Sequence, residues 1–235
     1  MKKVLLPTDF SANAWNAIAY AVNYFQNEKC LFYILHTYTP TFYRVDYMMG
    51  GPVNSAIPDK GVELAQAGLE KTLKDIRKYY PNKNHQFKTI SSFNILTDEI
   101  EKVIVREGID IIAMGTQGAT GAKEIFLGTN TVHVIKKAGI PVLAIPNGYA
   151  FKEIKTIVFP TDYTRPYDPE ALSFLAEMSK MLMAKLIILN VKEDFVLSEQ
   201  QNAHKKALSV FLETMDHSFE QVKGELMPNA IHEYV

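Results

Sequence analysis

Cysteine is almost absent from this chain, since Cys30 is the single one among 235 residues. One cysteine cannot form an intrachain disulfide, and this usage fits a reducing cytosol. Cys30 stands where a strand should begin, which favours a buried thiol over a reactive one. The six histidines are scattered, and no His/Cys cluster has the spacing of a metal site. The sequence therefore predicts a cytoplasmic protein that has no metal centre of its own.

An excess of charge of either sign is also absent. The 25 Lys and Arg residues are balanced by 26 Asp and Glu residues, and the lysines are dispersed. This distribution leaves no footprint for nucleic acid. The longest apolar runs are too short to span a bilayer, and Pro7-Thr8-Asp9 cuts off the first of them, which excludes a signal peptide. We therefore expect neither a nucleic acid nor a membrane as partner.

The chain does contain an internal repeat. Residues 3–11, KVLLPTDFS, reappear as residues 156–164, TIVFPTDYT. Further on, residues 32–35 match residues 186–189 in the same way. Each copy begins with a strand, a Pro-Thr-Asp turn, an amphipathic helix and a buried strand. A duplicated unit of about 150 residues is the simplest account of this pattern.

The first copy alternates strands with helices. We expect strands at about 3–7, 31–36, 86–92, 109–114 and 142–145. We expect helices at about 12–26, 59–80, 97–107 and 129–138, the first capped by Ser11 and the third by Thr97 or Asp98. In the first helix the inward face would be Ala14, Ile18, Ala21, Val22 and Phe25. Continuously apolar strands that alternate with helices predict an α/β fold, a Rossmann-like parallel sheet with helices on both faces.

The second copy is partial. It predicts a strand at 155–160, a helix at about 169–183 and a strand at 185–191. A helix at about 198–223 and the beginning of a strand at about 230–235 would follow. The predicted domains are therefore a complete one at 1–150 and a partial one at 151–235.

A glycine-rich loop follows the fourth strand of the first copy. Residues 115–129 read GTQGATGAKEIFLGT, with a helix after them. Glycines let a backbone approach a ligand closely, and the free N–H groups of a helix N-terminus favour an anion such as phosphate. Neither the Walker pattern nor the dinucleotide pattern occurs in the chain. The alternative is a surface loop without a ligand.

The Pro-Thr-Asp sequence after the first strand and the glycine-rich loop near the end of the first copy are the two informative motifs. At this separation they make the chain resemble the universal stress protein family, as a tandem-domain member. The resemblance implies a five-stranded parallel sheet of order 3-2-1-4-5, duplicated here with the second copy partial. It also implies pairing of two units through strand five and a bound adenine nucleotide, ATP or ADP or AMP. Mg²⁺ or Mn²⁺ would accompany the nucleotide.

The resemblance also implies roles for individual residues. Asp9 would accept hydrogen bonds at the ribose or adenine end, in a turn shaped by Pro7 and Thr8. The backbone around His36 and Thr37 would face the adenine, and Met114 and Gly115 would lie against the ribose. The phosphates would be held by Gly118, Gly128, Thr129, Asn130 and Thr131.

Some of these residues have a plainer interpretation. Asp9 could be a turn or capping residue of the first helix, and Thr129 could be the N-cap of the helix after the loop. A carboxylate suits hydroxyl donors and repels phosphate, so a ligand-binding Asp9 belongs at the sugar end. The second copy lacks the glycine motif, so we expect no binding residues there and a structural role for Asp162.

Three functions fit this pattern: a nucleotide-binding regulatory protein, a slow ATP hydrolase, and an interaction scaffold with an empty crevice. The loop offers Gln117, Lys123 and Glu124, which do not form a dedicated catalytic constellation. Binding is therefore favoured over catalysis. We also expect a homodimer, and the sequence does not indicate which other proteins are its partners. The segment 38–58 could be a lid over the nucleotide, a connector or a partner-binding surface.

Overall fold

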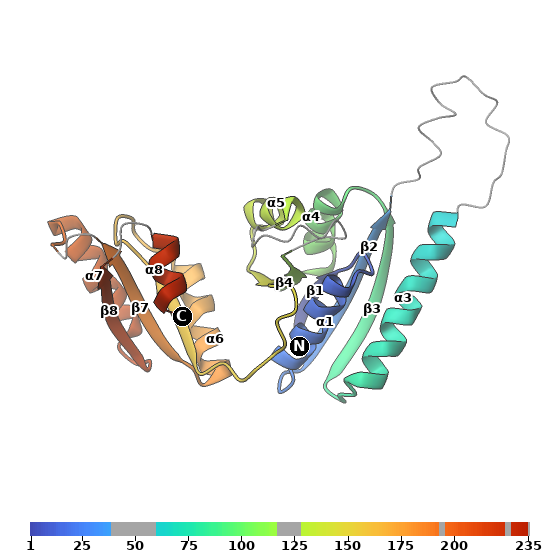
Figure 1. The fold of residues 1–235 in the computed structure, drawn as a ribbon, viewed down its shortest axis with the longest axis horizontal. Helices are drawn as coiled ribbons and strands as arrows, with labels where there is room; N and C mark the ends of the chain where they lie inside the picture. The colour runs from blue at the N-terminus through green and yellow to red at the C-terminus, as the bar shows by residue number, and fades with distance from the viewer. Residues whose placement is uncertain (39–59, 117–127, 193–195, 224–226, 235) are drawn as a thin grey trace, which may run out of the picture. The chain divides into compact units, whose positions relative to one another are not determined.

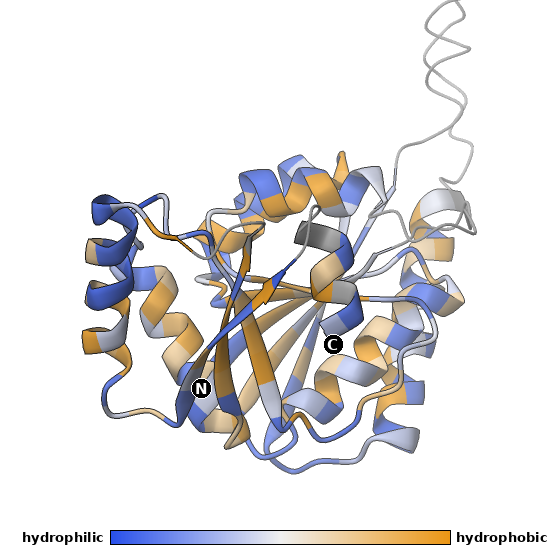
Figure 2. Ribbon diagram, turned by 60° about the vertical axis from the view of Figure 1, so that its left-hand side comes forward, coloured by the Kyte–Doolittle hydropathy of each residue, from blue (hydrophilic) through white to orange (hydrophobic). Residues whose placement is uncertain are grey.

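The computed structural model describes residues 1–38, 60–116, 128–192, 196–223 and 227–234 of the chain. These residues form two compact units, Met1–Phe151 and Lys152–Val235. Each unit is an α/β structure with its own parallel sheet (Figure 1). Apolar residues concentrate in the strands and on the helix faces turned toward them, as Figure 2 shows.

The first unit holds a five-stranded sheet. Its strands are β1 (Lys2–Pro7), β2 (Cys30–Tyr38), β3 (His85–Phe93), β4 (Ile111–Gly115) and β5 (Val142–Ile145). The order is β3-β2-β1-β4-β5, and all neighbouring pairs are parallel. The predicted fold class and strand order are confirmed.

Helices cover both faces of this sheet. They are α1 (Ala12–Tyr24), α3 (Lys60–Tyr79), α4 (Leu96–Glu107) and α5 (Thr129–Lys137). The helices α4 and α5 pack Ile100, Val103 and Val134 into one buried cluster with side chains of β1, β2 and β4. The helices α1 and α3 pack against the other face (Figure 1).

The ends of two helices test the predicted caps. The Ser11 hydroxyl accepts a hydrogen bond from the Ala14 N–H at 3.1 Å, so the predicted cap of α1 is confirmed. All five residues expected on the inward face of this helix are buried. The predicted cap of α4 is wrong, because the helix begins at Leu96 after Ile95, which has no side-chain cap. Asn94, one residue earlier, accepts from the Ile95 N–H at 2.9 Å and so organises this end of the helix.

The second unit holds a three-stranded sheet. Its elements are β6 (Thr156–Pro160), α6 (Pro169–Leu182), β7 (Lys185–Lys192), α7 (Glu199–Leu212), β8 (His217–Lys223) and α8 (Met227–Tyr234). The strands are parallel, in the order β6-β7-β8. This order repeats the β1-β2-β3 half of the first sheet.

The predicted helix at 198–223 and the predicted strand at 230–235 are both wrong. The helix α7 ends at Leu212, and its buried residues Leu208 and Leu212 belong to the core of the second unit. Residues 217–223 form a strand in register with β7, with Leu186 opposite His217. A helix, α8, then follows β8 as α4 follows β3. The apolar residues near 230 are too few for their periodicity to distinguish a strand from a helix.

Candidate functional site

The turn after β1 is held by its own side chains. The Thr8 N–H donates to the Leu35 carbonyl at 2.8 Å, and the buried Thr8 hydroxyl accepts from the Phe10 N–H at 3.0 Å. One Asp9 oxygen accepts from the Ser11 N–H at 3.0 Å, while the Asp9 side chain stays exposed. The turn therefore presents a carboxylate to solvent at the carboxyl end of β1.

The end of β2 is joined to this turn through His36. Its Nδ1 lies 2.8 Å from the Thr8 carbonyl oxygen, so this nitrogen carries the proton in the hydrogen-bonded arrangement. The ring of His36 stacks on Phe10, with 4.2 Å between the ring centroids. His36 and Thr37 are both half-buried and pair with Ser91 and Ser92 of β3. The side chain of His36 thus points to the turn.

The end of β4 is packed closely between two helices. The buried Thr131 hydroxyl of α5 donates to the Gly115 carbonyl at 2.9 Å. On the other side, a Cβ atom placed on Gly115 would lie 2.3 Å from Nδ2 of Asn13, a buried residue of α1. Gly115 is therefore required by the approach of Asn13. The Met114 side chain is buried in the core, so only its backbone can face a ligand at this end.

The helix α5 begins at the described end of the glycine-rich loop. Its N-cap is Gly128, whose φ of −54° and ψ of 148° are open to any residue, and among the described residues no side chain caps it. The alternative that Thr129 is the N-cap is therefore wrong, because Thr129 is the first helical residue. Thr129 and Asn130 are exposed, whereas Thr131 is buried. Gly118, Gln117, Lys123 and Glu124 lie outside the described residues, as does the segment 39–59.

The carboxyl ends of β1 and β4 are neighbours at the point where the strand order reverses. Strand β1 pairs with β4, Val4 opposite Ile111 and Leu5 opposite Ile112. In an open parallel sheet this switch point is where ligands bind, outside the carboxyl ends of the strands. The Pro-Thr-Asp turn and the start of α5 therefore flank one edge of the sheet. Sequence reasoning missed Asn13 and Phe10, although a polar residue among the apolar positions of α1 is a signal for the first.

The second unit repeats the turn with different partners. The Thr161 hydroxyl accepts from the Tyr163 N–H at 3.0 Å, and Asp162 accepts from the Thr164 N–H at 2.9 Å. Hydrogen bonds from Thr164 hold the pKa of Asp162 below its usual value. Asn190 follows β7 residue Leu189 as His36 follows Leu35, and its Nδ2 donates to the Thr161 carbonyl at 2.7 Å.

The helix α7 closes this second turn further. The Gln201 amide donates to the Asp162 carbonyl at 2.7 Å, and His204 Nδ1 lies 2.8 Å from the Tyr163 carbonyl oxygen. Together with Asn190, three side chains therefore form hydrogen bonds with three successive backbone carbonyl oxygens, those of Thr161, Asp162 and Tyr163. In the second turn these oxygens already have partners within the protein.

Neither a metal cage nor a membrane span is found in the described part of the chain. Among the residues described, no group of three or more His, Cys, Asp or Glu could hold a metal ion. Over the same residues, none of the helices combines the length and the apolar character that crossing a bilayer demands.

Comparison with known proteins places this geometry in a family. A family model described as the Universal stress protein family matches residues 1–146. Universal stress protein MJ0577 of Methanocaldococcus jannaschii is 32% identical over 154 residues, which are 61% of this chain and 94% of that protein. Universal stress protein MJ0531 of the same organism is 28% identical over 144 residues, which are 61% of this chain and 81% of that protein.

Two solved structures extend the comparison. The structure of MJ0577 superposes with a TM-score of 0.52 at 30% identity, over 63% of this chain and 98% of that one. A universal stress protein from Archaeoglobus fulgidus DSM 4304 has a TM-score of 0.70 at 19% identity, over 98% of this chain and 82% of that one. The second likeness concerns the fold alone, and it extends over both units.

Proposed function

Because the chain belongs to the universal stress protein family, we propose that it is a regulatory stress-response protein whose first unit alone binds ATP. ADP or AMP would occupy the same place, with the base toward His36 and Thr37 and the phosphates toward α5. Mg²⁺ or Mn²⁺ would be carried by the phosphates, which is the usual mode for Mg²⁺ at nucleotide sites. In this proposal the protein acts in the cytoplasm, and its partners are regulated by the nucleotide state.

The observation that carries the proposal is the junction of β4 with α5. The hydrogen bond that the Thr131 hydroxyl donates to the Gly115 carbonyl fixes the first turn of α5 beside the end of β4. No side chain in the described residues caps that turn at Gly128. Free N–H groups and the positive end of a helix dipole favour phosphate. The exposed Asp9 carboxylate at the neighbouring strand end suits the hydroxyl groups of a ribose.

A regulatory role is preferred over catalysis because the family is generally regulatory. Hydrolysis would need a positioned base or water-orienting group and a carboxylate for the metal. Asp9 already accepts from the Ser11 N–H and lies at the proposed sugar end. Slow hydrolysis and a ligand-free scaffold remain the competing functions.

Calorimetric titration with ATP and Mg²⁺ tests the proposal. We expect a stoichiometry near one site per chain. Asp9→Asn keeps an acceptor for the Ser11 N–H but loses the charge, and we expect it to weaken binding. Asp162→Asn makes the same change in the second turn and should bind like the parent. A stoichiometry near two would contradict the single site, and no binding of ATP, ADP or AMP would contradict the function.

The nucleotide that co-purifies with the protein separates the competing functions. After denaturation, absorbance and chromatography would identify it. ATP would support a sensor, while ADP or AMP would keep hydrolysis open as a competing function. An empty protein that also fails to bind added nucleotide would favour the scaffold.

A further inference from the structure

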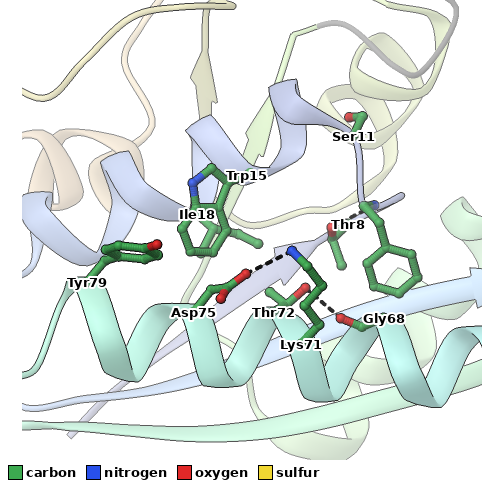
Figure 3. A pocket seen from close by; sticks show the side chains of 10 residues that line it. Thr8, Ser11, Trp15, Ile18, Gly68, Lys71, Thr72, Asp75 and Tyr79 are labelled. Carbon is green, nitrogen blue, oxygen red and sulfur yellow. Dashed lines mark hydrogen bonds and ion pairs between the residues drawn. The ribbon is translucent and has the colours of Figure 1, made fainter.

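A pocket of about 360 Å³ lies between α1 and α3, on the face of the first sheet that these two helices cover. Figure 3 shows Trp15 and Ile18 reaching it from α1, and Lys71, Thr72, Asp75 and Tyr79 from α3. This volume is at the lower end of the range for small-molecule sites. Thr8, Phe10 and Ser11 of the turn after β1 also line the pocket, and of the whole lining Thr8 alone belongs to the proposed nucleotide site.

The ring of Phe10 separates this pocket from the end of β2. One face of the ring stacks on His36 with 4.2 Å between centroids, and the ring also lines the pocket. On the α3 side, a Cβ atom on Gly68 would lie 2.5 Å from the ring. Phe10 is therefore wedged between the sheet and α3. The pocket reaches the turn after β1 through Thr8 and Ser11, while its lining in the described residues includes neither Asp9 nor a residue of α5.

The lining suits a flat ring system. Ile18 is 1% exposed and Thr72 9%, so they form a buried floor. The Thr72 hydroxyl already donates to the Gly68 carbonyl at 2.8 Å and therefore demands little from a ligand. Trp15 and Tyr79 add two aromatic rings, which pack well against another ring. Burying a flat apolar molecule here would remove apolar surface from water on both sides.

The charged groups in the pocket balance each other. Lys71 Nζ lies 2.9 Å from Asp75 Oδ2, and the lysine side chain is 79% exposed while the aspartate is 27% exposed. The pair carries no net charge, so it does not favour an ion of either sign. An ammonium group has three donors, and this contact uses one of them. Lys71 can therefore donate to a neutral acceptor at the pocket mouth.

We propose that this pocket is a second binding site, which takes a flat, uncharged aromatic molecule of about two fused rings with a hydrogen-bond acceptor. Its rings would lie with Trp15 and Tyr79 over Ile18, and Lys71 would donate to the acceptor. The proposal does not depend on nucleotide binding by the first unit.

Trp15 gives a specific readout because it is the only tryptophan of the chain. Its indole N–H produces a single cross-peak in a ¹H–¹⁵N spectrum. Coumarin, a neutral bicyclic lactone, is the probe, and coumarin-3-carboxylate is its anionic counterpart. We expect coumarin to shift the indole peak saturably and its carboxylate to bind more weakly.

Two variants test the lining against a matched control. Lys71→Met should weaken coumarin binding by about tenfold, the order expected for a hydrogen bond to a charged group. Tyr79→Ala should weaken it by a similar factor, because one aromatic wall is lost. Lys74→Met, on an exposed position of the same helix, should leave binding unchanged.

Three outcomes would overturn the proposal. The first is an indole peak that coumarin does not shift saturably in the folded parent protein. The second is tighter binding of the carboxylate than of coumarin, which would refute an uncharged ligand. The third is loss of coumarin binding at saturating ATP, which would make the pocket part of the nucleotide site. Coumarin binding to a protein that binds no nucleotide would support this site while refuting the proposed function.

Discussion

Phe10 and Tyr163 occupy equivalent positions in the two units. Each follows a Pro-Thr-Asp sequence in a left-handed backbone conformation, with φ of 63° and 58°. Each also donates its N–H to the threonine hydroxyl two residues earlier, at 3.0 Å in both turns. A positive φ is uncommon for residues other than glycine. The two units therefore share an unusual turn conformation together with the hydrogen bond that holds it.

The two rings differ in burial. Phe10 is 37% exposed, whereas Tyr163 is 1% exposed and lies in the core of the second unit. The hydroxyl of Tyr163 is buried and makes no hydrogen bond within the described part of the chain. Burial raises the pKa of this phenol to about 12. A buried hydroxyl without a partner costs stability.

Tyr163→Phe should therefore stabilise the second unit, by about 1 kcal/mol. The substitution removes the unbonded hydroxyl and installs the residue that the first unit already carries. Tyr167→Phe is the matched control, because its hydroxyl lies 2.7 Å from the Thr161 hydroxyl and its loss should destabilise. Urea denaturation measures both. An equal loss of stability in the two variants would contradict the assignment.

Gly115→Ala should destabilise the first unit by about 1–3 kcal/mol, the usual cost of overpacking. The added methyl group would lie 2.3 Å from Asn13 Nδ2. Asn13→Ala in the same chain should restore much of this loss, since it removes the obstructing group. A double-mutant cycle in urea measures the coupling between the two positions. Additive effects would show that Asn13 is not the obstacle.

Gly128→Val tests the start of α5 as a phosphate site. The backbone at Gly128, φ −54° and ψ 148°, is accessible to valine, so the fold should persist by circular dichroism. The added side chain would occupy space at the helix N-terminus that a phosphate needs, so nucleotide binding should be lost. Calorimetry measures it, with Gly118→Val in the same loop as a companion variant. If both bind ATP like the parent, the loop is not the site.

Much of this fold could be predicted because several strands, such as β1, β2, β4 and β5, are apolar runs that alternate with amphipathic helices. The cap at Ser11 and the buried face of α1 followed from local rules. The prediction of one helix over 198–223 was wrong because no glycine or proline before Gly224 marks the end of α7 or the start of β8. The short helix α8 was predicted as a strand because its few apolar residues fit the periodicity of a strand as well as that of a helix.

The sequence could indicate the edge of the sheet that is proposed as the site, but not how the residues around it pack. In an open parallel sheet ligands bind where the strand order reverses, and the Pro-Thr-Asp sequence follows β1 at that point. The contacts of Asn13 with Gly115 and of His36 with Thr8 join elements that are far apart in sequence. No local pattern encodes them, because they depend on how α1 and β2 pack after the sheet has formed.

Stability of the first unit should depend on pH through His85. This ring is 8% exposed and packs on Phe32, and its Nε2 lies 3.0 Å from the Phe25 carbonyl oxygen. Its Nδ1 finds no partner among the described residues. Burial lowers the pKa of His85 below 6.5. As the pH falls below about 6.5, the unfolded chain gains a proton before the folded one, so the free energy of unfolding decreases.

The decrease should continue until the pH reaches the lowered pKa of the folded state, and it should be absent above about pH 7.5. Urea denaturation at a series of pH values from about 7.5 downward measures the slope of the free energy of unfolding against pH. His85→Gln should flatten it, whatever its effect on the overall stability. His133→Gln, at an exposed position of α5, should keep the slope of the parent. A slope that survives in His85→Gln would assign it to another group.

Each sheet ends on one side in a half-buried apolar strand. In the first unit this strand is β5, where Val142, Leu143 and Ala144 are half-buried, and it pairs only with β4 among the described strands. In the second unit the strand is β6, which pairs only with β7 among them and leaves Val158 half-buried. Apolar edge strands invite pairing with another chain.

We therefore expect a two-fold homodimer built through β5, β6 or both, because a two-fold contact joins the same surface of two copies. Sedimentation at micromolar concentration should give a mass near twice 26.6 kDa. Lysine on an edge strand opposes pairing, so Leu143→Lys and Val158→Lys should each weaken the dimer if their strand contributes. Whichever variant becomes monomeric identifies the interface. A parent protein that sediments as a monomer would contradict both interfaces, because it would mean that neither edge is available to a second copy.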